Sequence, residues 1–98
     1  MPQETTLRTV IFKDGDSWVG QCLEYDIGAQ ANSLEELHRR LRIVIAAERA
    51  ESTKQNGAAF AGIDPAPKYF HDMWEKRSGF FRPNTEGAEP ESEMALCA

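Results

Sequence analysis

Residues 21–37 read QCLEYDIGAQANSLEEL, and they contain the change from an extended segment to a helix. Ser33, followed three residues later by Glu36, forms a capping-box pattern, in which side chains satisfy free backbone amides at a helix start. The residues that follow, LHRRLRIVIAAERAE, place apolar side chains at helical spacing. We therefore predict a helix over about residues 34–51, with one apolar side that packs on a sheet.

The segment before this helix has the pattern of a β-meander. Residues 7–12 alternate β-branched and apolar side chains, and KDGD at 13–16 contains the Asp-Gly pair that favours a hairpin turn. A second strand over residues 17–25 would return antiparallel, and a short third strand would span residues 27–32.

The predicted hairpin is apolar on both faces. Successive strand residues alternate sides, so Trp18 and Cys22 point one way, and Val19, Leu23 and Tyr25 point the other. Such a sheet must be covered twice, either by a second helix or by another subunit.

The chain after the main helix has three predicted parts. Residues 58–62 would add a short fourth strand, and PKYFHDMWEKR predicts a short amphipathic helix at about residues 67–78. From Pro83 the apolar content is too low to offset the entropy of ordering, so we expect residues 83–98 to form an acidic, disordered tail. The predicted class is α+β: an antiparallel β-meander of three to four strands packed on one main helix, in a single domain over residues 1–82.

Charge and composition limit the classes of partner. The 98 residues carry a net charge of −5, all 11 Lys and Arg residues precede Pro83, and Glu86, Glu89, Glu91 and Glu93 follow it. The basic residues are too few to favour unaided nucleic-acid binding, so DNA binding is not expected. We expect no membrane span and no signal peptide, two reduced cysteines, and therefore a cytoplasmic protein.

Polar residues offer two weak candidate sites. Glu24 and Asp26 lie two residues apart near a strand end, where they could hold a metal or act as acid and base, although solvated acidic residues are ordinary there. Arg39 and Arg42, with Arg40, could contact RNA or an acidic protein. The simpler interpretation is a salt-bridged surface, because Glu35–Arg39 and Glu36–Arg40 are favourable i,i+4 pairs.

No residue set in the sequence specifies an enzyme. His38 and His71 lack the neighbours that metal-ligand motifs require, and no phosphate-binding loop or nucleophile motif is present. We therefore predict no catalytic residues, no metal and no cofactor.

Apolar residues outside the predicted helix–sheet contact suggest an interface. A chain of this length has little spare stability, so we expect a homo-oligomer, a dimer or a tetramer. The interface candidates are Trp18, Ile43, Ala47, Tyr69, Phe70, Met73 and Trp74. The aromatic residues among them could also bind a ligand, although at helical spacing they are more often core.

The hairpin, the short third strand and the capped helix form one ordered pattern over about residues 7–50. Its residues are Trp18, Val19, Gln21, Cys22, Leu23, Ile27, Ser33, Leu34, Glu35 and Glu36. In this pattern the chain resembles the HicB-like antitoxin family. The resemblance implies a β-meander with one helix, described as a partial RNase H-like fold, and a protein that binds and neutralises a small basic ribonuclease toxin.

The chain departs from the HicB-like pattern at two points. Ala31-Asn32 stands where the family usually has Gly beside an acidic residue, and the single helix near residues 67–78 replaces the DNA-binding element that many members append. The resemblance therefore implies a stand-alone protein-binding module, either an antitoxin or a self-assembling homologue. The alternative is a metal-dependent hydrolase or RNA-binding protein with a partial RNase H-like fold.

Overall fold

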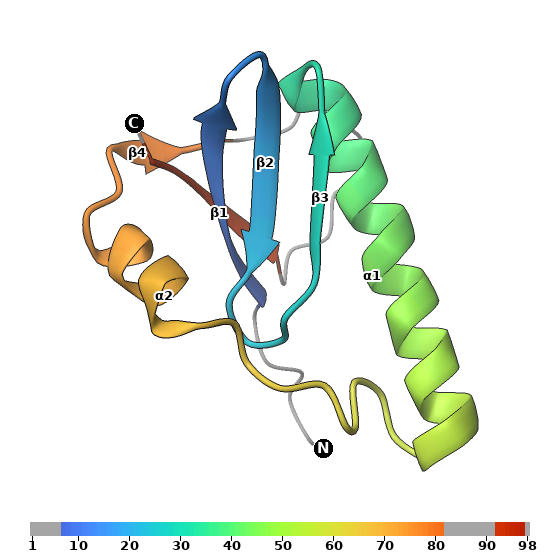
Figure 1. Ribbon diagram of the computed structural model, residues 1–98. Helices are drawn as coiled ribbons and strands as arrows, with labels where there is room; N and C mark the ends of the chain where they lie inside the picture. The colour runs from blue at the N-terminus through green and yellow to red at the C-terminus, as the bar shows by residue number, and fades with distance from the viewer. Residues whose placement is uncertain (1–6, 82–91, 98) are drawn as a thin grey trace.

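The computed structural model of the chain describes residues 7–81 and 92–97. Its elements are β1 (Leu7–Asp14), β2 (Ser17–Cys22), β3 (Gly28–Ala31), α1 (Leu34–Asn56), α2 (Lys68–Glu75), β4 (Gly79–Phe80) and β5 (Ser92–Leu96). The strands form one sheet in the order β3-β2-β1-β5-β4 (Figure 1). The α+β class is confirmed.

The first three strands form the predicted meander. Asp14 of β1 lies opposite Ser17 of β2, so Gly15 and Asp16 make the hairpin loop. Gly15 has a φ of 63°, in the left-handed region that glycine tolerates best. β3 pairs antiparallel with β2, with Trp18 opposite Ala31.

The strands on the other side of β1 differ from the prediction. β5 runs parallel to β1, and β4 pairs antiparallel with β5. The sheet is therefore mixed and has five strands among the described residues, instead of three or four antiparallel strands. The prediction of a disordered tail is wrong for residues 92–96, because Met94 and Ala95 are buried in the sheet. Residues 82–91 and 98 lie outside the described residues.

The predicted fourth strand over residues 58–62 is also wrong. The chain turns there, and Phe60 and Gly62 adopt left-handed backbone conformations that a strand does not use. The Phe60 amide donates to Oγ of Ser52 at 2.6 Å, and the Phe60 ring stacks on Tyr25 with ring centroids 4.4 Å apart. These contacts hold the segment against the end of α1 and against the turn after β2.

α1 starts where the sequence predicts and continues beyond it. The Glu36 amide donates to Oγ of Ser33 at 3.2 Å, which confirms the N-cap. The helix reaches Asn56 instead of ending near residue 51, because no helix breaker precedes Gly57. Gly57 has a φ of 82°, and its amide donates to the Thr53 carbonyl at 3.0 Å, which closes the helix.

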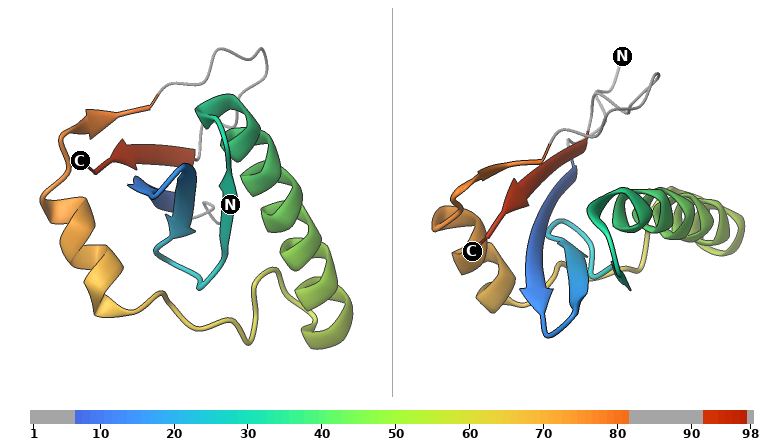
Figure 2. Two further views of the ribbon diagram at one scale, coloured as in Figure 1. Left: turned by 45° about the horizontal axis from the view of Figure 1, so that its top comes forward. Right: turned by 90° about the horizontal axis from the view of Figure 1, so that it is seen from above.

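α1 and α2 cover opposite faces of the sheet (Figure 2). α1 packs Leu37 and Leu41 against the sheet, together with Ile11, Ala31 and Met94. α2, which lies within the predicted range, packs Trp74 on the other face with Val10, Leu23 and Ala95. The second helix therefore supplies part of the second cover that the two-faced hairpin requires.

The predicted alternation of side chains is confirmed for Trp18, Cys22 and Leu23 and is wrong for Tyr25. Trp18 and Cys22 pack on the α1 side, whereas Leu23 packs on the α2 side. Tyr25 was predicted to follow Leu23, but it packs on the α1 side with Phe60. β2 ends at Cys22, so the turn after it breaks the alternation.

α1 approaches β2 most closely at Gly20. A Cβ atom built on Gly20 would lie 2.7 Å from Cδ1 of Leu41, which is buried. Glycine at this position therefore fixes how closely the helix can pack on the sheet.

Candidate protein-binding surface

Glu24 and Asp26 do not form a joint site. Glu24 Oε2 lies 2.6 Å from Nε of Arg8, and its Oε1 accepts the Arg8 amide at 2.7 Å. Asp26 instead accepts a hydrogen bond from Nε2 of Gln21 at 2.8 Å. Within residues 7–81 and 92–97, no three His, Cys, Asp or Glu side chains gather as metal ligands.

The Arg8–Glu24 pair helps to hold α2 on the sheet. The Arg8 guanidinium lies 5.5 Å from the centre of the Trp74 ring, and Arg77 lies 5.1 Å from it. Two cations thus contact one aromatic ring, an arrangement that stabilises the packing of the ring. Because Glu24 holds Arg8, this cluster is structural.

Most of the aromatic interface candidates pack in or against the core. Trp74 is only 8% exposed, Phe70 and Met73 pack around it, and Trp18 packs on the α1 side. Tyr69 differs, because 65% of its surface is exposed. Of the candidates on α2, only Tyr69 is left largely available to a partner.

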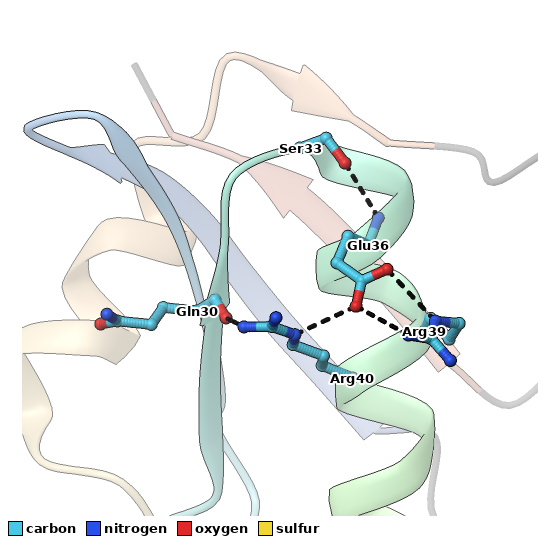
Figure 3. Close-up of polar contacts among 5 residues, drawn as sticks. All are labelled: Gln30, Ser33, Glu36, Arg39 and Arg40. Carbon is cyan, nitrogen blue, oxygen red and sulfur yellow. Dashed lines mark hydrogen bonds and ion pairs between the residues drawn. The ribbon is translucent and has the colours of Figure 1, made fainter.

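Glu36 organises a polar network at the start of α1 (Figure 3). Its Oε2 lies 2.9 Å from Nη2 of Arg39 and 3.1 Å from Nε of Arg40, and Nη1 of Arg40 donates to the Gln30 carbonyl at 2.8 Å. The predicted Glu36–Arg40 pair is confirmed, whereas Arg39 pairs with Glu36 and not with Glu35. Hydrogen bonds from Arg39 and Arg40 lower the pKa of Glu36.

The outward side of α1 carries the exposed apolar residues that the sequence predicts. Ile43 is 58% exposed, and Ala47 and Ala50 are exposed as well. Together with the polar residues on the same side, they form a set that we call the α1 seam: Glu36, Arg40, Ile43, Ala47, Ala50 and Lys54.

The α1 seam has the spacing of a coiled-coil contact. Its members follow one another at alternating intervals of about four and three residues, the a/d spacing of a heptad. Glu36, Ala50 and Lys54 were not among the sequence candidates. The repeat of fours and threes in the printed sequence is the signal that would have found them.

Arg42 is an exposed neighbour of the α1 seam, and it forms no ion pair with any residue that the structure describes. It lies on the same helix as His38, which is buried. Burial first, and the charge of Arg42 second, lower the pKa of His38. His38 is therefore neutral at neutral pH, and its buried side chain contributes to the packing of α1.

The two thiols are not activated nucleophiles. Cys22 is buried and Cys97 partly buried, and neither is in a disulfide. Burial raises the pKa of both thiols, which keeps them protonated at neutral pH.

Comparisons of the chain with protein-family models, with curated proteins and with solved structures find no match. Within the described residues, neither helix combines the length and apolar character that crossing a membrane requires.

Proposed function

We propose that this chain is a protein-binding module that acts through the α1 seam. The observation that carries the proposal is Ile43, a large apolar side chain that is 58% exposed in the middle of a long helix. Ala47 and Ala50 extend the apolar surface along one side of the helix. An exposed row of this kind, bordered by charged residues, is typical of a surface that binds another helix.

The antitoxin role is the more specific form of this proposal. It is supported by the resemblance to HicB-like antitoxins over residues 7–50 and by the net charge of −5, which attracts a small basic toxin at long range. The α1 seam itself holds Arg40 and Lys54 beside one acidic residue, so the contact with any partner would be mainly apolar at Ile43.

No observation favours the hydrolase or RNA-binding alternative. Its acidic candidates are bonded to different partners, Glu24 to Arg8 and Asp26 to Gln21. Of its basic candidates, Arg39 and Arg40 pair with Glu36.

The experiment is affinity purification of the tagged full chain from its native host, with identification of stoichiometric partners by mass spectrometry. Wild type is compared with Ile43→Glu, which puts a charge in the middle of the α1 seam. Tyr69→Glu is the matched control, because Tyr69 is similarly exposed but lies on α2. We expect Ile43→Glu to lose the partner and Tyr69→Glu to keep it. A partner that both variants retain would contradict the proposal.

A further inference from the structure

The α1 seam is complementary to itself when two helices run in opposite directions. Its apolar members lie in the middle. Glu36, which pairs with Arg39 and Arg40 of its own helix, lies at the start, and Lys54 lies near the end. We propose that the protein bound by the α1 seam is a second copy of this chain, with the two α1 helices antiparallel. This inference rests on the proposed function, because it names the occupant of the same surface.

The register follows from the spacing of the α1 seam. If Ile43 faces Ala47 of the second copy, the two-fold symmetry places Ala47 against the second copy's Ile43. Each contact then joins one large and one small side chain, which lets the helices approach closely.

The same register brings opposite charges together at both ends. Glu36 faces the second copy's Lys54, and Arg40 lies over the second copy's Ala50 and beside its Glu51. Symmetry repeats each of these pairs, so the dimer gains two Glu36–Lys54 pairs.

A parallel arrangement of the two α1 helices would bring like charges together. There Arg40 would face Arg40, and Lys54 would face Lys54, so both ends of the α1 seam would repel. Charge therefore selects the antiparallel orientation.

Among residues 7–81 and 92–97, no helix or strand covers the outward side of α1. α1 packs its inward side on β2 and β3, and its outward side faces away from the sheet in both views of Figure 2. The bond from Arg40 to the Gln30 carbonyl and the pair with Glu36 order the start of the seam before binding. Preordered side chains lose less entropy on association.

The contact between two helices is small. A helix of 23 residues is about 35 Å long, and one helix face buries less than the ~800 Å² per partner of a standard interface. We therefore expect a reversible dimer that dissociates on dilution.

Sedimentation equilibrium of the full chain over a wide concentration range tests the inference. Lys54→Glu places like charges at both ends of the α1 seam, and we expect the dissociation constant of the dimer to rise about tenfold. Glu36→Lys should weaken the dimer at least as much, because it also removes the pairs of Glu36 with Arg39 and Arg40. Lys76→Glu, an identical charge change at an exposed position after α2, is the control that should leave the dimer unchanged.

Mixing the two variants separates a charge effect from a folding defect. In an antiparallel heterodimer of Lys54→Glu with Glu36→Lys, both ends of the α1 seam again hold opposite charges. The equimolar mixture should therefore dimerise within about threefold of wild type, although each variant alone does so poorly. Circular dichroism checks that each variant keeps its helices.

Different results would overturn different claims. A wild-type dimer that Lys54→Glu does not weaken, or a mixture that fails to recover, would overturn the antiparallel seam. A chain that stays monomeric at every concentration, yet captures another protein in an Ile43-dependent manner, would overturn the second copy as occupant and leave the proposed function standing. A monomer that captures nothing would contradict both.

Discussion

α1 and α2 cover the two faces of one sheet, but different interactions stabilise them. α1 has 23 residues, a side-chain N-cap from Ser33, a glycine C-cap and ion pairs in its first turns. α2 has eight residues, begins after Pro67 without a side-chain cap, and depends on Trp74 for its contact with the sheet. Isolated helices as short as α2 are unstable in water. The comparison shows that α1 is specified locally, whereas α2 is specified by tertiary contact.

This difference bears on the proposed function. Because α1 is stabilised by its caps, its ion pairs and its inward side, its outward side can hold exposed apolar residues such as Ile43 without loss of the helix. α2 uses its apolar side chains to pack on the sheet, and Tyr69 is the large apolar residue that it exposes. A binding surface therefore fits α1 better than α2.

The largest expected effect is the loss of the contact that holds α2. Trp74→Ala removes a buried ring that packs with Val10 and Leu23 and lies against Arg8 and Arg77. We expect the free energy of unfolding to fall by about 3–5 kcal/mol. Urea unfolding measures this loss, and hydrogen exchange should show that α2 loses protection while the first turns of α1 keep theirs. A loss below about 1 kcal/mol would show that α2 does not depend on Trp74.

The next effect tests the close contact between α1 and the sheet. Gly20→Val places methyl groups where Leu41 packs, since even a Cβ atom would lie 2.7 Å from its Cδ1. We expect a destabilisation of about 1–3 kcal/mol from overpacking. Gly79→Val is the control, because a Cβ atom at Gly79 meets nothing within 4 Å. Equal unfolding free energies for the two variants would contradict the close packing of α1 on β2.

The elements of the sheet also differ in how well the sequence predicts them. The hairpin, the third strand and the start of α1 depend on neighbouring residues, such as the Asp14-Gly15 turn and the Ser33 cap, and all three are confirmed. β5 was missed because its apolar residues, Met94, Ala95 and Leu96, end a segment rich in Glu and Pro whose overall apolar content is low. Its place in the sheet depends on pairing with β1, more than eighty residues earlier in the chain.

The residues of the candidate site also differ in how well the sequence predicts their positions. Helical spacing was enough to place Ile43 and Ala47 on the outward side of α1. The same spacing could not tell whether Trp74 is buried or exposed, because this depends on which face of the sheet α2 covers. The pairing of Glu24 with Arg8 was hidden for the same reason, since the two residues meet only when the start of β1 lies beside the turn after β2.

A smaller effect is expected from the local signal that starts α1. Ser33→Ala removes the hydroxyl oxygen that accepts the Glu36 amide, and we expect a loss of about 1 kcal/mol in the free energy of unfolding. Ser33→Asp, which supplies another N-cap acceptor, should retain most of the stability. If Ser33→Ala unfolds at the wild-type urea concentration, α1 does not depend on its cap, and the contrast with α2 is weaker than described.

The smallest effect concerns the buried histidine of α1. Burial, and then the charge of Arg42, lower the pKa of His38 below its ordinary value of about 6.5. The unfolded chain therefore binds a proton more readily than the folded chain, so folding stability should decrease as pH falls below about 6.5. His38→Gln should show a flatter dependence between about pH 7 and pH 5.5 in urea unfolding. Arg42→Gln should flatten it partially, because it removes only the second cause. A His38→Gln variant with the wild-type slope would mean that other groups cause the loss, and that the inward side of α1 tolerates the charged imidazole.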